Sequence, residues 1–174
     1  FIQIGTKMGA GTFFNYFNAF GLTKKTGIDL PGEAQSQFYT AEGLGPVQLA
    51  SCSFGQSNKI TPIQMVTAVA TIANGGDLVQ THLVSKVLDA SGNLVEDLEP
   101  EAKRQVISEE TAKTICSIMQ EASGRAAVKG YRVGGKSGTS QKLDSGDPEA
   151  RISSFVGIAP CDDPQIAVLV ILDE

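Results

Sequence analysis

The stretch from Val133 to Ser140, written VGGKSGTS, places one lysine and three hydroxyl side chains among three glycines. An ammonium group beside serine and threonine hydroxyls can bind an anion, and a charge-assisted hydrogen bond is stronger than a neutral one. The same residues can also form a polar turn that carries no chemistry. Because a Lys-Ser-Gly tripeptide occurs by chance in many proteins, the rest of the sequence must decide between an anion-binding strand and a turn.

Other residues that often carry chemistry offer less. His82 is the only histidine, and we interpret it as a partly buried residue at the start of a strand, so a Ser-His-Asp or Cys-His mechanism has little support. The three cysteines, Cys52, Cys116 and Cys161, have no partner at a metal-ligand spacing. The acidic stretch from Glu96 to Glu101 is interpreted as a solvated connection. We therefore expect no metal site, no disulfide scaffold and no cofactor.

Composition limits the class of protein. The 174 residues are 41% hydrophobic and 19% charged, which suits one globular domain or a large part of one. A net charge of −5 and no Lys/Arg cluster in the sequence argue against binding to nucleic acid. The sequence has no apolar run of about 18 residues that would span a membrane. A start at Phe1, without a signal pattern, suggests a fragment.

The elements around VGGKSGTS predict a sheet. Two runs, from Ile152 to Ala159 and from Gln165 to Leu172, read as a hairpin, and the second is apolar on consecutive residues. We therefore expect both faces of the second run to be covered, in the middle of a sheet with helices on each side. The motif precedes this hairpin through the polar loop from Lys142 to Arg151, so it can form a third, antiparallel strand.

Strand geometry then orders the motif. Glycines weaken a strand and are tolerated where a backbone or ligand approaches closely. A period of two places Lys136 and Gly138 on one face, and Ser137 and Thr139 on the other, unless a twist at the glycines brings them together at the rim.

Three helices are expected to support the sheet. Phenylalanines at helical spacing predict a helix from Gly11 to Phe20. Thr61, Pro62 and Gln64 form a capping-box pattern for a helix that ends at Asn74-Gly75-Gly76. Another helix begins at Ser108, with two acidic residues in its first turn. Its buried face is expected to hold Ala112, Ile115, Met119 and Ala122.

The remaining segments are shorter or irregular. The residues from Lys24 to Gln37 are rich in glycine, proline and polar side chains, which predicts an irregular loop. The runs from Val84 to Asp89 and from Leu94 to Glu96 flank a turn signal and predict a hairpin.

These blocks resemble class B penicillin-binding proteins, the transpeptidases of division, elongation and sporulation. Residues 135 to 139 are similar to the third motif, Lys-Thr/Ser-Gly, of penicillin-recognising serine enzymes. The order and spacing of the other blocks match nearly the whole chain. The blocks that carry the resemblance are Ser53-Phe54-Gly55-Gln56, Thr61-Pro62-Ile63-Gln64-Met65, Ala73-Asn74-Gly75-Gly76, Gly134 to Gln141, Ser154-Phe155-Val156-Gly157-Ile158-Ala159-Pro160 and Asp163-Pro164.

The resemblance implies a fold and roles for single residues. The fold is α/β of the α+β type, an antiparallel sheet flanked by helices. Catalytic roles fall to Lys136, which holds a proton-delivering hydroxyl network, and to Thr139, whose backbone N–H supplies half of an oxyanion hole. Ser137 and Thr139 would bind the substrate carboxylate, while Gly138 leaves room for substrate backbone. Gln141 and Gln56 would line the site. Ser57 stands where many relatives have glycine, which puts the conformation of its loop in question.

The resemblance also identifies what this sequence lacks. Such enzymes use a nucleophilic serine in Ser-x-x-Lys and a second motif, Ser-x-Asn, both expected before Phe1. The sequence contains no Ser-x-x-Lys, and Ser91-Gly92-Asn93 is expected to be a chance match within a turn. We therefore expect residues 1–174 to be the C-terminal portion of a transpeptidase domain, cut at both ends and inactive alone. In the family fold a strand from before the nucleophile covers the last strand.

The implied partners follow from that reading. They are peptidoglycan stem peptides, β-lactams, other cell-wall synthesis proteins, and either the missing N-terminal part or a second copy at an exposed sheet edge. The implied location is the extracytoplasmic face of the bacterial membrane, with an N-terminal anchor outside this chain. The alternatives are a β-lactam sensor domain, which is a receptor, and a catalytically silent cell-wall scaffold. A β-lactamase fits less well, because residues 154 to 164 resemble a transpeptidase.

Overall fold

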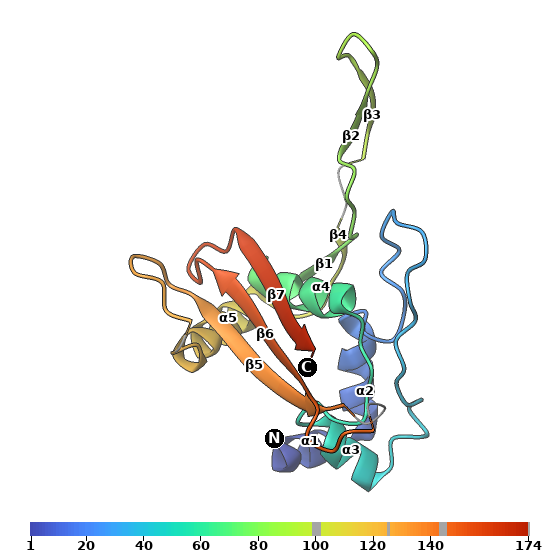
Figure 1. Cartoon of the computed structure of the whole chain (residues 1–174), viewed down its shortest axis with the longest axis vertical. Helices are drawn as coiled ribbons and strands as arrows, with labels where there is room; N and C mark the ends of the chain where they lie inside the picture. Colours follow the sequence, from blue (N-terminus) through green and yellow to red (C-terminus); the bar gives the residue numbers. More distant parts are fainter. Residues whose placement is uncertain (99–101, 125, 143–145, 174) are drawn as a thin grey trace. The chain divides into compact units, whose positions relative to one another are not determined.

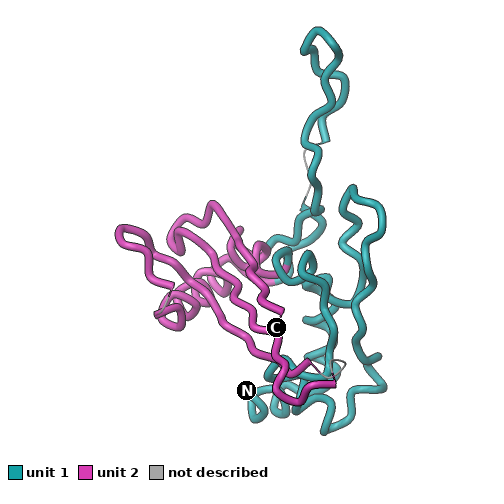
Figure 2. The backbone as a smooth tube through the Cα atoms, in the orientation of Figure 1, with its two compact units in different colours: residues 1–67, 77–106 teal, residues 68–76, 107–174 magenta. Residues whose placement is uncertain are grey.

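The computed structural model describes residues 1–98, 102–124, 126–142 and 146–173. They divide into two compact units, shown in two colours in Figure 2. The first unit comprises residues 1–67 and 77–106, and the second comprises residues 68–76 and 107–174. The division falls within one helix, α4. We describe each unit by itself.

The first unit is built from helices and two small two-stranded sheets, labelled in Figure 1. Its helices are α1 (Ile2–Met8), α2 (Ala10–Ala19), α3 (Pro46–Cys52) and the beginning of α4 (Pro62–Ala73). One sheet pairs β1 (Asp77–Val79) with β4 (Ala102–Gln105), and the other pairs β2 (Lys86–Leu88) with β3 (Leu94–Asp97). The predicted helix from Gly11 to Phe20 is confirmed as α2. Its Phe17 ring stacks on Phe38 with centroids 4.0 Å apart.

The predicted capping box at the start of α4 is confirmed. The Gln64 N–H donates to Thr61 Oγ1 at 3.3 Å, and the Thr61 N–H donates to Gln64 Oε1 at 3.0 Å. The Gln64 side chain is 1% exposed, and its Nε2 donates to Lys24 O at 2.6 Å and to Ser36 Oγ at 3.1 Å. One side chain therefore closes the helix start and ties it to the irregular segment from 24 to 37.

The predicted hairpin is confirmed as β2 and β3: β2 is shorter than expected at both ends, and β3 extends one residue further, to Asp97. Ser91-Gly92-Asn93 lies in its turn, as expected of a chance match. Asp29 fastens the chain before β2, because its carboxylate accepts hydrogen bonds from Leu83 N at 2.7 Å and Val84 N at 2.9 Å. The Val84 N–H bond, with smaller help from the others, lowers the pKa of Asp29 below its ordinary value.

The structure corrects the expectation for His82, and it describes only part of the acidic stretch from Glu96 to Glu101. His82 is partly buried, but it lies in no strand: its Nδ1 lies 3.3 Å from Gln80 O, and β2 begins only at Lys86. The pairing of β1 with β4 was not predicted, since β1 is only three residues long. Of the acidic stretch, Glu96, Asp97 and Leu98 are described and exposed, whereas residues 99–101 lie outside the described residues.

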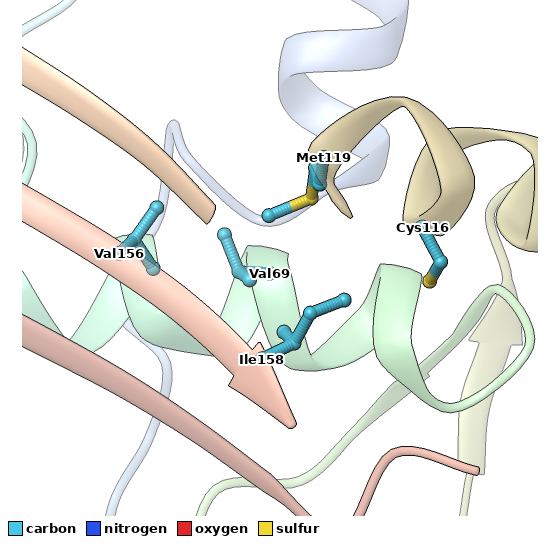
Figure 3. Close-up of a cluster of buried hydrophobic side chains, with 5 residues drawn as sticks. All are labelled: Val69, Cys116, Met119, Val156 and Ile158. Atoms are coloured by element: carbon cyan, nitrogen blue, oxygen red, sulfur yellow. The ribbon is translucent and has the colours of Figure 1, made fainter. Parts of the chain in front are cut away.

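The second unit packs a three-stranded antiparallel sheet against α5 (Glu109–Ala122) and the last part of α4. The strands are β5 (Gly134–Gln141), β6 (Arg151–Ala159) and β7 (Ile166–Asp173), in the order β5-β6-β7. Figure 3 shows the core: Val69 from α4, Cys116 and Met119 from α5, and Val156 and Ile158 from β6. The two helices therefore cover one face of the sheet with apolar side chains.

The predicted helix at Ser108 is confirmed as α5, with one correction to its buried face. Ser108 caps it, because its side chain accepts a hydrogen bond from Thr111 N at 3.2 Å. Ala112 and Met119 are buried as expected, and Ile115 is partly buried. Ala122 is exposed, because it lies in the last turn, and Cys116 fills the core position that the prediction missed.

The predicted position of the last run is wrong within this chain. Among the described strands β7 pairs with β6 alone, so it is an edge strand rather than a middle one. Four of its apolar side chains are about half exposed or more: Ile166, Val168, Val170 and Leu172. The unpaired strand that the resemblance implied for this chain is thus present among the described strands, and its exposed apolar side chains, at alternate positions, lie on one face of β7.

Candidate active-site strand

The VGGKSGTS stretch forms β5 and not a turn. It pairs with β6 without a break, from Gly134 opposite Ile158 to Gln141 opposite Arg151. The predicted third, antiparallel strand is therefore confirmed. Among the described strands β5 has only this one neighbour, so its other edge presents backbone N–H and C=O groups that no strand uses.

The first two glycines of β5 are required by packing on opposite faces. A Cβ atom on Gly134 would lie 2.5 Å from Cys161 Sγ and 3.2 Å from Gln120 N, so this residue lets the strand lie closely against α5. A Cβ on Gly135 would overlap the ring of Phe155 and lie 2.8 Å from Val156 O. Both positions are buried. These two glycines therefore allow β5 to pack closely against its neighbours; they do not provide space for a ligand.

The next four residues, Lys136 to Thr139, are all exposed. Residues directly opposite in an antiparallel pair share a face, and Lys136 and Gly138 stand opposite Val156 and Ser154 in the register. Ser137 and Thr139 stand opposite Phe155 and Ser153, so the predicted alternation is confirmed.

The Lys136 ammonium nevertheless reaches the neighbouring residue, because Nζ donates to Ser137 O at 2.5 Å. A cation, two hydroxyls and the backbone of a free strand edge therefore lie within four consecutive residues. This arrangement can bind a carboxylate and can offer a backbone N–H to a developing oxyanion.

Ser154 is a neighbour of the motif that the sequence did not single out as a site residue. It stands opposite Gly138, its Oγ donates to Gly138 O at 3.4 Å, and a Cβ on Gly138 would lie 3.0 Å from that oxygen. Only the strand register brings them together, although Ser154 opens one of the blocks that carry the resemblance. The hydroxyl therefore limits the side chains that position 138 can carry.

Gln141 ends β5 and its side chain contacts the loop that follows. Its Nε2 donates to Pro148 O at 3.2 Å, and Arg151 Nη1 donates to the same carbonyl at 2.7 Å. In this structure Gln141 therefore supports the described end of the loop from Lys142 to Arg151. Residues 143–145 of that loop lie outside the described residues.

Gln56 belongs to the first unit, in the turn that follows α3. Its N–H donates to Ser51 O at 3.1 Å, and its carbonyl accepts from Asn58 Nδ2 at 3.0 Å. The neighbouring Ser57 has a φ of 62° and Gly55 a φ of 89°. Ser57 thus occupies the left-handed region that favours glycine, which explains why a glycine at that position suits this loop.

The second unit also holds an ion pair, Arg132 with Asp162, and two free thiols, Cys116 and Cys161. Arg132 donates to Asp162, and this bond holds the pKa of that carboxyl below its ordinary value. The cysteines are free thiols, and burial raises the pKa of Cys116 and Cys161. Within the described part of the chain, no group of three His, Cys, Asp or Glu side chains is placed to hold a metal ion.

No helix among the described residues is long and apolar enough to cross a lipid bilayer.

The whole chain, residues 1–174, matches the family described as penicillin binding protein transpeptidase domain. Stage V sporulation protein D of Bacillus subtilis is 43% identical over 181 residues, covering 99% of this chain and 28% of that protein. The probable peptidoglycan D,D-transpeptidase FtsI of Caulobacter vibrioides is 30% identical over 188 residues, covering 99% of this chain and 30% of that protein.

Solved structures show the same fold. Penicillin binding protein 3 of Mycobacterium tuberculosis, complexed with aztreonam, matches with a TM-score of 0.91 at 25% identity, over 99% of this chain and 42% of that one. The transpeptidase domain of penicillin-binding protein 3 from Burkholderia pseudomallei matches with a TM-score of 0.85 at 29% identity, over 99% of this chain and 52% of that one. The chain thus spans between about a quarter and a half of these relatives.

Proposed function

Because this chain belongs to the family of penicillin-binding protein transpeptidase domains, in its class B branch, we propose that it supplies the substrate-carboxylate side of a peptidoglycan DD-transpeptidase site. The observation that carries this proposal is that β5 lies at an edge of the described sheet and that its four consecutive residues Lys136 to Thr139 are exposed. The relatives named above include a probable peptidoglycan D,D-transpeptidase and a penicillin binding protein complexed with aztreonam.

Each exposed residue of β5 has a proposed role in the acyl transfer. The hydroxyls of Ser137 and Thr139 donate to the free carboxylate of the donor stem peptide, or to that of a β-lactam. The Lys136 ammonium raises the local positive potential and strengthens the hydroxyl network by charge-assisted bonds. The backbone N–H of Thr139 gives one of two donors to the oxyanion of the tetrahedral intermediate.

Two further residues have supporting roles in the proposal. Gly138 is proposed to leave room for substrate backbone; a Cβ there would also lie 3.0 Å from Ser154 Oγ. Gln141 and Gln56 are proposed to line the site, Gln141 while it also holds Pro148 O.

The nucleophile is proposed to lie outside residues 1–174. In such a reaction a serine attacks the D-alanyl-D-alanine peptide, forms an acyl-enzyme, and passes the acyl group to an amine on a second stem peptide. The sequence contains no Ser-x-x-Lys, so residues 1–174 are proposed as the C-terminal portion of the catalytic domain. The remainder of the domain would then be a physical partner of this chain.

The setting of the whole protein is part of the proposal. Peptidoglycan lies outside the cell membrane, so the substrate requires an extracytoplasmic location, with an anchoring segment outside this chain. Its relatives carry names from sporulation and from peptidoglycan synthesis, which supports partners among the cell-wall synthesis proteins.

Labelling with a fluorescent penicillin tests the proposed function. We expect the whole protein that carries this chain to acquire a covalent label that survives denaturing electrophoresis, whereas residues 1–174 expressed alone remain unlabelled. Preincubation with an unlabelled β-lactam is the control and should abolish the signal. An unlabelled whole protein would refute the transpeptidase proposal, and stable labelling of the chain alone would refute the external nucleophile.

A further inference from the structure

A cavity in the first unit, whose lining includes no residue of β5, gathers positive charge. Its volume is about 150 Å³ and its lining includes Lys24, Lys25, Lys103 and Arg104. That volume exceeds the space that one water needs, on the order of 10–15 Å³. The cavity therefore has room for a small polyatomic ion.

Two of the cations are fixed by hydrogen bonds to backbone carbonyls. Arg104 uses Nε and Nη2 to donate to Ala19 O at 2.9 Å and 2.6 Å, and Nη2 also donates to Asn18 O at 3.1 Å. These carbonyls close the C-terminal end of α2, where the helix dipole favours a cation. Lys103 Nζ donates to Thr26 O at 3.1 Å. Strand β4 thus presents both side chains at the cavity in defined positions.

The other two cations come from the segment that follows α2. Lys24 and Lys25 are exposed and line the same cavity. The Lys24 backbone is held in place, because its carbonyl accepts the 2.6 Å bond from the buried Gln64. The backbone at Lys24 is therefore held by a buried side chain of the same unit.

The lining beneath the cations is buried and partly polar. Thr67 and Leu78 are 9% and 6% exposed, and the hydroxyls of Thr67 and Thr81 lie 3.1 Å apart. Because Thr67 Oγ1 donates its hydrogen to Ile63 O at 2.7 Å, Thr81 Oγ1 is the donor within the pair. Thr81 can turn its O–H toward a bound oxygen in exchange for its bond to Thr67, so the cavity combines cations with one neutral donor.

The charge of the cavity runs against that of the whole chain, whose formal net charge is −5. No acidic residue of the described part of the chain is among its lining residues. Glu33 lies beside it: its Oε1 accepts from Thr26 N at 2.6 Å and from Thr26 Oγ1 at 2.8 Å, and these bonds, with a smaller contribution from the charge of Lys25, lower its pKa. Glu33 therefore offsets part of the charge of Lys25, and the four cations of the lining still leave the cavity with a net positive charge.

We propose that this cavity binds a phosphate group. A dianionic phosphate matches several cations better than a single carboxylate does, and its oxygens can accept charge-assisted bonds from lysine and arginine together. Two sources offer this chemistry: inorganic phosphate or diphosphate in solution, and the headgroup of a phospholipid. This inference is independent of the proposed transpeptidase function, because it uses none of the β5 residues.

Calorimetric titration of the whole protein with inorganic phosphate and with diphosphate tests the proposal. We expect saturable binding, tighter for diphosphate, that weakens as salt rises. The double variant Lys24→Gln/Lys25→Gln should weaken it at least about tenfold, since each hydrogen bond to a charged group contributes roughly that factor. Lys7→Gln/Lys86→Gln removes two exposed lysines of the same unit outside the cavity lining and should leave affinity unchanged.

Hydrogen exchange locates the bound ion and keeps the test decisive if a variant folds poorly. With diphosphate added to the unaltered protein, peptides covering residues 20–27 and 103–105 should gain protection. Protection confined to β5, no binding at all, or equal affinity in both double variants would overturn the proposal.

Vesicles distinguish the two sources of phosphate. If phosphatidylglycerol vesicles bind the protein and the cavity double variant reduces that binding relative to the control pair, the phosphate belongs to a headgroup. If diphosphate binds in the cavity while the vesicles do not compete with it, the phosphate is free in solution.

Discussion

Among single residues, the first two of β5 are glycines needed for packing, and the next four carry the accessible polar groups. Gly134 and Gly135 are buried and meet Cys161 and Phe155, while Lys136 to Thr139 are exposed. The boundary arises because the sheet is packed against α5 at one end of β5 and open at the other. Substitutions on the two sides of that boundary should therefore affect different properties.

Lys136→Ala in the whole protein should slow acylation by a penicillin about a hundredfold to a thousandfold, the effect typical of losing one electrostatic contact in an acyl-transfer site. The midpoint of thermal unfolding should stay unchanged, because the side chain is exposed. Stopped-flow or gel-based acylation rates measure the effect, with the exposed Lys129→Ala as control. A normal rate in Lys136→Ala would make the motif purely structural.

Gly134→Ala should lower the free energy of unfolding by about 1–3 kcal/mol, because the added methyl group overpacks the contact between β5 and α5. Urea unfolding of the whole protein, followed by circular dichroism, measures it. Gly124→Ala is the control, since a Cβ there has no neighbour within 4 Å. Equal stability of the two variants would mean that β5 can move off α5 without cost.

At the scale of elements, buried polar side chains fix how segments join. Gln64 links the start of α4 to Lys24 O and Ser36 Oγ, and Ser108 starts α5. Both patterns were legible in the sequence as caps, because a cap uses neighbouring residues. The tertiary half of the Gln64 contacts was not, because its partners lie 28 and 40 positions away.

Gln64→Leu should lower the free energy of unfolding by about 2–4 kcal/mol, because it leaves buried carbonyl and hydroxyl groups without their donor. Denaturant unfolding of the whole protein measures the change. Gln3→Leu, at an exposed position of α1, is the matched control and should have little effect. If both leucine variants unfold alike, the buried hydrogen bonds of Gln64 contribute little net stability.

At the scale of the whole molecule, the sheet ends on an apolar edge. Along β7, Ile166, Val168, Val170 and Leu172 are exposed, and among the described strands only β6 pairs with it. An exposed apolar strand edge pairs readily with another chain. We propose that a segment outside residues 1–174, the proposed remainder of the domain, covers this edge in the whole protein.

The chain expressed alone should self-associate through β7, whereas the whole protein should not do so at this edge. Sedimentation velocity measures the masses. Val168→Lys should shift the isolated chain toward monomer, because a charge on the exposed row opposes pairing; Val47→Lys, at an exposed position of α3, should not. An isolated chain that is monomeric without substitution would show that the edge is protected in another way.

The local features of this protein, and its family, could be read from the order of its residues. The capping box at Thr61, the N-cap at Ser108, the three helices, the hairpins and the strand nature of VGGKSGTS depend on neighbouring residues. The motif blocks carried the resemblance to class B penicillin-binding proteins that the comparisons confirmed. Spacing alone also gave the alternation of Lys136 and Ser137 along the strand.

Contacts between residues far apart in the sequence could be seen only in the folded structure. The sequence did not reveal that Gly134 abuts α5, that Ser154 limits Gly138, that Cys116 replaces Ala122 in the core, or that four cations share one cavity. Such contacts join residues far apart in the chain, and their geometry depends on register and packing rather than on periodicity. The position of β7 at an edge has the same cause, because a strand's own residues do not specify which neighbours the rest of the sheet supplies.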